Sequence, residues 1–335
     1  MKSPCISILL PVRNEECYLP AALDSIFRQT YSQWELIAVD DFSYDRTPEI
    51  LAGAASNDRR VRVVRPSSPG LVNALNAGLA HCRGELVARM DGDDICHSSR
   101  LELQASALDA DPGIGMVACV FRHFPRNRIR RGMLAYESWQ NSLLIHDEII
   151  RDLFVESPFV HSSVMFRKKL VEDVGGYRDM GWAEDYDLWL RLAGLGIRFA
   201  KLAETMLFWR ERPERATRNL PAYSPESFRA CKAHHLSREF LKGVDVVILA
   251  GAGLEGRRWR SVLAREGIGV SLWVDVDPRK VGRTLHGAKI VAPEAVKAGL
   301  GKMLITVGTP GAREGVRKWA LDTGFREGVD FLCVT

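Results

Sequence analysis

Short apolar runs of strand length alternate with amphipathic segments of helix length through the first hundred residues. The strand patterns are "CISILL", "WELIAV", "VRVV" and "ELVARM". Between the first two, Leu19, Leu23 and Ile26 recur at three- and four-residue spacing, which is typical of a helix. Strands that alternate with helices predict right-handed crossovers and an α/β fold with a mostly parallel sheet flanked by helices.

The alternation loosens after the fourth strand. "GMVACV" and "SSVMFR" still have the pattern of strands, and "EDYDLWLRLAGLG" that of an amphipathic helix. Residues 121–160 show neither period and are predicted to be irregular. We therefore expect one α/β domain over residues 1–220, followed by a linker and connecting helix over residues 221–243.

A second strand–turn–helix pattern follows the linker. "VDVVILAGAGLEG" places Gly251, Gly253 and Gly256 between a strand and a helix as G-x-G-x-x-G, and Asp275 ends the next strand, where a ribose-binding acid belongs. This pattern predicts a small Rossmann-like domain over residues 244–335. Two interpretations stay open: the domain binds a nucleotide, or the glycines serve only the tight turn of the fold.

Composition narrows the class of protein. The chain has 335 residues, 46% of them hydrophobic and 26% charged, and a net charge of +4, which does not indicate a nucleic-acid partner. The seven cysteines are scattered and never form C-x-x-C, which favours reduced thiols. No apolar run has the length of a membrane span. We expect a cytoplasmic protein, with peripheral contact to a membrane left open.

Polar residues gather where the predicted strands end. In open α/β sheets the ligand lies beyond the carboxyl ends of the strands. Those ends carry Arg13 and Asn14, then Asp40 and Asp41, and then the acidic stretch "DGDD". Carboxylates suit hard cations such as Mn²⁺ or Mg²⁺, which in turn bind phosphates. A cation site is therefore predicted, against the alternative of an acidic turn held by its own hydrogen bonds.

Four segments resemble one known family in the family's own order. They are "ISILLPVRNEECYLPAALDSIFRQTYSQWELIAVDDFSYDRT", "LNAGLAHCRGELVARMDGDDICHSSRLELQ", "HSSVMFRKKLVEDVGGY" and "WAEDYDLWLRL". Together they are similar to glycosyltransferase family two, over roughly residues 4–212. The resemblance implies a GT-A fold and inverting transfer of a sugar from a nucleotide-sugar donor, in polysaccharide or glycoconjugate synthesis.

The resemblance also implies roles for individual residues. Asp185 matches the general base, with Glu184 beside it, and Asp91 and Asp93 match the Asp-x-Asp that holds Mn²⁺ or Mg²⁺. The residues implied on the nucleotide-sugar side are Pro11, Arg13, Asn14, Asp40, Asp41, Asn76, Arg89 and Asp91. His161, Trp182 and Trp189 are candidates on the acceptor side. The alternative for His161 is a purely structural role, and the alternative for Trp189 is a place in the hydrophobic core.

The chain departs from the family pattern after the base. "WRERPERATR" has Arg212 where the family often has a histidine, so either the third metal ligand is in doubt, or Arg210 and Arg212 contact phosphates. The Gln-x-x-Arg-Trp signature of processive synthases is absent, which favours addition of one sugar to a saccharide, lipid-linked or protein acceptor. "FRHFPRNRIRRG" is a solvated loop or a loop over an anionic acceptor.

Two functions of other classes remain as alternatives. A nicotinamide-dependent oxidoreductase or nucleotide sensor would use Gly251, Gly253, Gly256 and Asp275 of the second domain. A sugar-binding scaffold without catalysis would keep only the fold. The joint presence of Asp91, Asp93 and Asp185 favours an enzyme over such a scaffold.

Overall fold

The computed structural model describes residues 6–308 and 311–335. The chain divides into two compact units, each with a sheet of its own. The first unit comprises Met1–Ile149, Pro158–Met180 and Glu184–Asn219, and the second comprises Ile150–Ser157, Gly181–Ala183 and Leu220–Thr335. The second unit thus takes two short segments from within the first two hundred residues.

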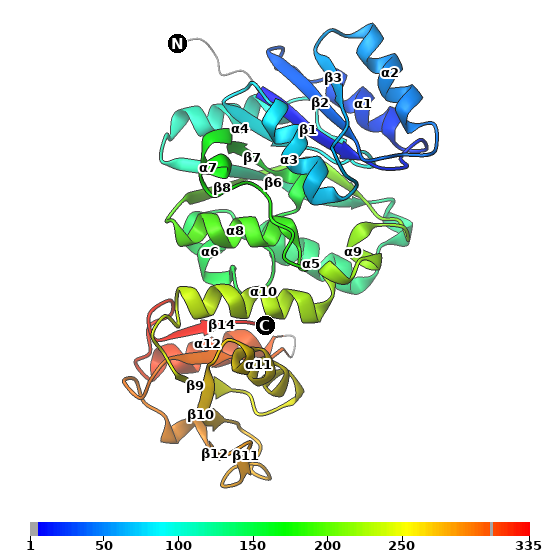
Figure 1. Ribbon diagram of the computed structural model, residues 1–335. Coiled ribbons are helices and arrows are strands. Elements are labelled where there is room, and N and C mark those ends of the chain that lie inside the picture. The colour runs from blue at the N-terminus through cyan, green and yellow to red at the C-terminus, as the bar shows by residue number, and fades with distance from the viewer. Residues whose placement is uncertain (1–5, 309–310) are drawn as a thin grey trace. The chain divides into compact units, whose positions relative to one another are not determined.

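The sheet of the first unit has eight strands in the order β3-β2-β1-β4-β7-β6-β8-β5. The strands β1 to β4 are mutually parallel, whereas β7 runs antiparallel to both β4 and β6 (Figure 1). The bounds are β1 Ile6–Val12, β2 Trp34–Asp40, β3 Val61–Val64, β4 Leu86–Arg89, β5 Ile95–Cys96, β6 Ile114–Phe124, β7 Met165–Arg167 and β8 Arg198–Arg210.

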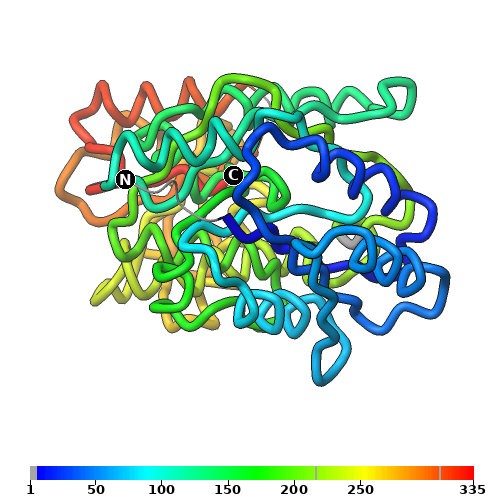
Figure 2. The backbone as a smooth tube through the Cα atoms, turned by 90° about the horizontal axis from the view of Figure 1, so that it is seen from above, coloured from blue at the N-terminus to red at the C-terminus, as the bar shows by residue number. Residues whose placement is uncertain are grey.

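Helices connect these strands and cover the sheet. Figure 2 follows the backbone from above, and the first hundred residues, coloured blue to cyan, occupy one side of the view as alternating strands and helices. The helices are α1 Leu19–Phe27, α2 Thr47–Asn57, α3 Leu71–His81, α4 Arg100–Ala110, α5 Arg131–Ser142, α6 His146–Asp152, α7 Lys168–Asp173, α8 Glu184–Gly194 and α9 Ala216–Asn219, with two short 3₁₀ helices, η1 Arg126–Arg128 and η2 His161–Ser163. No helix of the described residues has the length and apolar content required to span a membrane.

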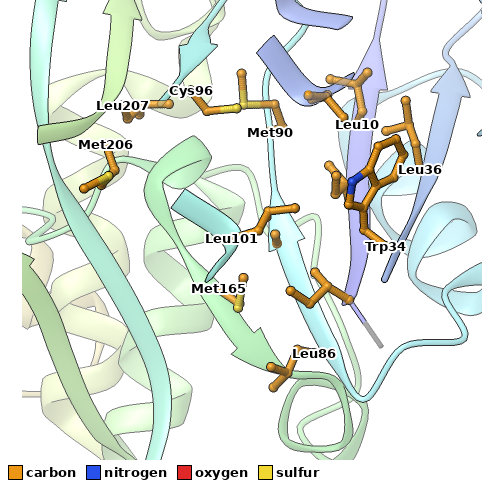
Figure 3. Packing of buried hydrophobic residues seen from close by; sticks show 14 of the residues in the cluster. Leu10, Trp34, Leu36, Leu86, Met90, Cys96, Leu101, Met165, Met206 and Leu207 are labelled. Atoms are coloured by element: carbon orange, nitrogen blue, oxygen red, sulfur yellow. The ribbon is translucent and has the colours of Figure 1, made fainter. Parts of the chain in front are cut away.

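The core of the first unit fixes the strands that carry the site. Alternate residues of β1 point into one apolar cluster with Trp34 and Leu36 of β2, Leu86 of β4 and Met165 of β7 (Figure 3). Each fully buried large apolar side chain contributes about 1.5–3 kcal/mol. On the other face of β1, Leu9 contacts α3 so closely that a Cβ on Gly78 would lie 2.2 Å from Leu9 Cδ1. Packing on both faces therefore holds the strand ends rigidly.

The prediction that residues 121–160 are irregular is wrong. Strand β6 continues to Phe124, and α5 and α6 follow. Two side chains of α5 contact the sheet through polar groups: Glu137 Oε2 accepts a hydrogen bond from His123 N (2.7 Å), and the Asn141 amide both donates to and accepts from the Phe121 backbone. Because the buried residues of α5, Glu137 and Gln140, are polar, the helix shows no hydrophobic period in the sequence.

The second unit contains a six-stranded sheet in the order β11-β12-β10-β9-β13-β14. Its parallel strands occur in the order third, second, first, fourth, fifth, which is that of a doubly wound sheet. The bounds are β9 Val246–Ala250, β10 Gly269–Val274, β11 Thr284–Leu285, β12 Ala288–Val291, β13 Met303–Ile305 and β14 Phe331–Cys333, with the helices α10 Pro225–Arg238, α11 Leu254–Arg265 and α12 Ala312–Asp322 and the 3₁₀ helices η3 Pro221–Tyr223 and η4 Pro293–Ala295.

Candidate active site

Three adjacent parallel strands of the first unit end at one edge of its sheet. The register pairs Val12 of β1 with Asp40 of β2, and Leu9 of β1 with Arg89 of β4. A hydrogen bond from Asp41 N to Val12 O (2.9 Å) extends the pairing beyond the strand ends. The loops that follow these three strands therefore meet at the edge where a ligand is expected in an α/β sheet.

The end of β2 and the residue after it carry two buried carboxylates, Asp40 and Asp41. Asp40 Oδ1 accepts a hydrogen bond from Ser43 N (3.0 Å), and Asp41 Oδ1 accepts one from Gly70 N (2.8 Å). The second oxygen of Asp41 lies 3.7 Å from Arg13 Nη1, and the Arg13 side chain is 51% exposed. These contacts leave the Arg13 guanidinium within reach of a ligand at the strand ends.

Three other residues predicted on the donor side hold the backbone of the site. Asn14 has φ +56° and accepts a hydrogen bond from Tyr44 N through its Oδ1 (3.0 Å). The Asn76 amide donates to Tyr177 O and accepts from Tyr177 N, both at 2.9 Å. Pro11 is buried within β1, one residue before the end of that strand. All three thus have structural contacts in the described residues.

The loop after β4 brings three carboxylates together. Oxygen atoms of Asp91, Asp93 and Asp94 lie within 4.8 Å of one another. Asp94 is buried and accepts hydrogen bonds from Ser162 Oγ (2.5 Å) and Arg210 N (2.8 Å). Asp94 therefore anchors the loop, while Asp91 and Asp93 form the part of the cluster that can receive a ligand.

Burial and mutual repulsion act on these carboxylates. Burial, followed by the charge of Asp91, raises the pKa of Asp93. Burial also raises the pKa of Asp94 well above its usual range, with Asp93 adding to the effect. Burial acts on Asp91 in the same direction, but its ion pair with Arg89 outweighs burial and lowers the pKa of Asp91. The cluster holds more negative charge than its surroundings stabilise.

Arg212 compensates part of this charge. Its Nε donates to Asp93 Oδ2 at 2.7 Å, and its Nη2 forms an ion pair with Glu15. Glu15 follows β1, and its backbone N–H donates to Thr47 Oγ1 (2.7 Å). Burial, reinforced by Asp93, raises the pKa of Glu15 to about 8, despite the opposing charge of Arg212. The Arg212 guanidinium thus joins two acids from different loops.

The donor atoms of this cluster fit a divalent cation. Carboxylate oxygens from closely spaced residues are the ligands that Mg²⁺ and Mn²⁺ prefer. Asp91 and Asp93 would hold the ion, and their repulsion would fall when it binds. Arg212 stands where a third protein ligand was expected from the family pattern, and it carries a positive charge.

A second acidic group lies at the start of α8. Burial, followed by the adjacent Glu184, raises the pKa of Asp185 to about 8. Glu184 Oε1 lies 3.6 Å from His161 Nδ1, and His161 Nε2 lies 2.9 Å from the Tyr177 hydroxyl. Burial, with a contribution from Arg89, lowers the pKa of His161. A carboxyl group with so high a pKa is suited to accept a proton near neutral pH.

Arg89 links the two acidic groups. Its side chain is 3% exposed and forms an ion pair with Asp91. Its charge also acts on Asp185 and Glu184. The positive charge of Arg89 thus acts on the predicted metal ligand Asp91 through an ion pair and on the predicted base Asp185 through its field.

The two tryptophans predicted near the acceptor have different surroundings. Trp189 is fully buried and packs edge-to-face against Phe159 and His161, with ring centroids 5.8 Å apart in each pair. Trp189 is therefore a core residue, as its place in the helix allowed. Trp182 belongs to the second unit and lies 5.2 Å, centroid to centroid, from the His234 ring.

Glu15, Ser162 and Thr47 complete the site but were not predicted from the sequence. Glu15 directly follows Asn14 in the stretch "PVRNEE". Its position next to the end of the first strand could have indicated it as a site residue. Ser162 and Thr47 carried no such signal, because their contacts join residues 68 and 32 positions apart.

In the second unit, the glycine-rich turn is close-packed. Gly251 has φ +116°, and a Cβ on Gly256 would lie 1.9 Å from Gly251 O, so only glycine fits there. Asp275 accepts hydrogen bonds from Ala252 N (3.0 Å) and Lys280 Nζ (2.8 Å). Gly253 borders open space. The contacts of Gly251, Gly256 and Asp275 are accounted for by the fold of the turn itself.

The first unit thus combines a mixed α/β sheet, an acidic cluster beyond the ends of its parallel strands and a second acidic pair at the start of α8, as in an enzyme site of an α/β protein. The family model of glycosyl transferase family 2 matches residues 7–175. The chain belongs to glycosyl transferase family 2 and is a glycosyltransferase.

Individual proteins support the family and the fold. The chain is 31% identical over 207 residues to the amylovoran biosynthesis glycosyltransferase AmsE of Erwinia amylovora, covering 60% of this chain and 74% of AmsE. Its fold is similar to that of S. aureus TarS 1–349 in complex with UDP-GlcNAc (TM-score 0.55, 18% identity, 78% of this chain and 71% of the TarS chain). It is also similar to the mannosyltransferase PcManGT of Pyrobaculum calidifontis in complex with GDP-Man and Mn²⁺ (TM-score 0.52, 22% identity, 80% and 70%). The first unit therefore has the GT-A fold.

Proposed function

We propose that this glycosyltransferase transfers a sugar from a nucleoside-diphosphate sugar to an acceptor hydroxyl with inversion, assisted by Mn²⁺ or Mg²⁺. The observation that carries the proposal is the arrangement around Arg89: its ion pair with Asp91 on one side and its charge acting on Asp185 on the other. The names of AmsE and of the two structural neighbours support a role in glycan synthesis and a nucleotide-sugar donor.

The donor would lie at the ends of β1, β2 and β4. Asp40 and Asp41 would contact the base or ribose, and Arg13 would reach the nucleotide from the adjacent loop. Asp91 and Asp93 would hold the divalent cation, which supplies positive charge to stabilise the departing diphosphate. Arg212, already bonded to Asp93, would add positive charge at the same place.

Asp185 would take the proton from the acceptor hydroxyl as that oxygen attacks the anomeric carbon. The adjacent Glu184 helps to raise the pKa of Asp185, so the deprotonated carboxylate is a stronger base than an exposed aspartate. The His161–Glu184 and His161–Tyr177 contacts hold Glu184 in place. A single displacement with the base and the leaving group on opposite faces of the sugar gives inversion.

A panel of nucleotide sugars tests the proposal. The thermal midpoint of the full chain is measured with each nucleotide sugar in Mn²⁺ and in EDTA, and the nucleotide sugar that gives the largest shift in Mn²⁺ is then used for turnover. We expect Mn²⁺-dependent release of the nucleoside diphosphate, and NMR of the product should show the opposite anomeric configuration. Equal turnover in EDTA would reject the metal, and a retained configuration would reject inversion.

A further inference from the structure

A cavity of about 750 Å³ opens beside the acidic cluster in the first unit. It is lined by Arg128 and Arg130 from the segment after β6, and by Arg212 and Arg218 from the segment after β8, together with two glutamates. Cavities of roughly 300–1,000 Å³ are the usual size for small-molecule sites. Four guanidinium groups around one such cavity are suited to a phosphate-bearing ligand.

The four arginines differ in how their charge is balanced. Arg212 pairs with Asp93 and Glu15, and Arg218 pairs with Glu211. Arg128 and Arg130 are exposed, and neither forms an ion pair with any residue in 6–308 or 311–335. The lining therefore has two arginines outside any ion pair of the described residues, against one such glutamate, Glu214, and keeps an excess of positive charge.

The walls of the cavity are held together by the fold. Glu211 N donates to Phe124 O (2.8 Å), which joins the end of β8 to the end of β6. Arg218 Nη2 lies 3.5 Å from Met133 Sδ, so α9 and α5 are side by side (Figure 1). Arg215 covers the Trp209 ring at 3.7 Å. The arginines are thus carried by segments that contact one another.

The position of the cavity separates it from the proposed donor pocket. The donor residues come from the ends of β1, β2 and β4, whereas most of the cavity lining follows β6 and β8, which β7 separates from β4 in the sheet; Tyr18, from the loop after β1, lines the side nearest the donor residues. Arg212 lies at the border, because it lines the cavity and also binds Asp93. An anion in the cavity would therefore lie close to the reacting centre but outside the nucleotide pocket.

We infer that this cavity binds a phosphate or diphosphate group of the acceptor, so that the enzyme uses a phosphate-bearing acceptor. The inference rests on the proposed function, because the acceptor is defined relative to the donor pocket. Arg128 and Arg130 bind the anionic group through charge-assisted hydrogen bonds, and its hydroxyl-bearing part extends toward Asp185.

The first experiment titrates inorganic pyrophosphate into the metal-free full chain in EDTA by calorimetry. We expect the double variant Arg128→Gln/Arg130→Gln to weaken binding by at least about tenfold. The matched control is Arg122→Gln/Arg131→Gln, which removes the same charge from exposed arginines of the same stretch outside the cavity lining and should change the Kd by less than about twofold. Unmeasurable binding to the wild-type chain, or an equal loss in both variants, would overturn the site.

A second experiment identifies which substrate the cavity serves. UDP and GDP are titrated with Mn²⁺ into the wild type and into Arg128→Gln/Arg130→Gln. We expect the nucleotide Kd to stay within about twofold, because the donor residues lie elsewhere. A tenfold loss would assign the cavity to the donor diphosphate and overturn the acceptor site. Failure of Mn²⁺-dependent nucleotide binding in the wild type contradicts the proposed function instead, while pyrophosphate binding in EDTA still decides the anion site.

Discussion

Each of the two sheets places an acidic residue just after a parallel strand, but the two places differ in how the charge is balanced. After β4, Asp93 and Asp94 keep raised pKa values, because they are buried and close to other carboxylates. After β10, burial acts on Asp275 in the same direction, but Lys280 and the backbone N–H groups of Asp277 and Ala252 outweigh it and lower the pKa of Asp275. The carboxylates of the first site are only partly balanced by Arg89 and Arg212, whereas Asp275 is balanced by its own neighbours.

This difference shows that a position at a strand end does not by itself define a ligand site. The G-x-G-x-x-G pattern of the second unit is explained by close packing, since a Cβ on Gly256 would clash with Gly251 O. The Asp-x-Asp of the first unit is compensated only in part: Arg89 pairs with Asp91 and Arg212 with Asp93, yet burial and the charge of Asp91 keep the pKa of Asp93 raised. Uncompensated charge is therefore the better guide to function here, and substitutions at both places can test it.

The largest expected effect is at the proposed base. Asp185→Asn keeps the shape of the side chain but cannot accept the proton, so kcat should fall about 10²–10⁴-fold, with no fall in the thermal midpoint, because burial already opposes the charge of Asp185. The control Asp147→Asn removes an exposed acid from the first turn of α6. If both variants keep near-normal kcat, Asp185 is only a favourable charge at a helix start.

The acidic cluster should give the next largest effect. Asp93→Ala removes a proposed metal ligand, so kcat/KM should fall about 10²–10³-fold, and Mn²⁺ binding followed by EPR should weaken in parallel. Asp24→Ala, which removes an exposed acid paired with Arg28, should change neither quantity. Mn²⁺ binding that survives in Asp93→Ala would place the cation elsewhere.

The pH dependence of the rate separates the base from the metal site. The pKa of Asp185 is raised to about 8, so this carboxyl group is protonated and inactive as a base at lower pH. kcat/KM should therefore rise about tenfold per pH unit below this value and level off above it. In Asp185→Asn, this rise of kcat/KM with pH should be absent. A flat profile between about pH 6 and 8 would contradict the assignment.

The first four strands of the fold were predictable, since their hydrophobic runs and the intervening helical periods are strong. Helix α5 was not, because Glu137 and Asn141 make its buried contacts through polar groups. In the site, the acids at the strand ends followed from topology. The ion pair of Glu15 with Arg212 did not, because it joins residues 197 positions apart and depends on where β8 ends. Local patterns contain no information about such contacts.

A smaller effect is expected at Arg212, which occupies the acidic cluster as an internal cation. A divalent ion bound by Asp93 must share that carboxylate with the guanidinium, whose Nε lies 2.7 Å away. Arg212→Ala should therefore tighten Mn²⁺ binding by about tenfold, measured by EPR titration. Arg46→Ala, which removes an exposed arginine paired with Glu49, is the control and should leave Mn²⁺ affinity unchanged. Weaker binding in Arg212→Ala would mean that the arginine supports the metal site.

The smallest effect is expected in the second unit. Asp275→Asn keeps an acceptor for only one of the two N–H groups of Ala252 and Asp277, and it loses the charge that pairs with the partly exposed Lys280. The free energy of unfolding should fall by about 1 kcal/mol or less, seen as a small drop in thermal midpoint, while kcat/KM stays within about twofold. Lys280→Met tests the same ion pair from the other side and should give a similar shift. A tenfold loss of transfer activity in Asp275→Asn, without loss of stability, would show that Asp275 also binds a ligand. The charge balance at the ends of β4 and β10 would then not distinguish a ligand site from a structural one.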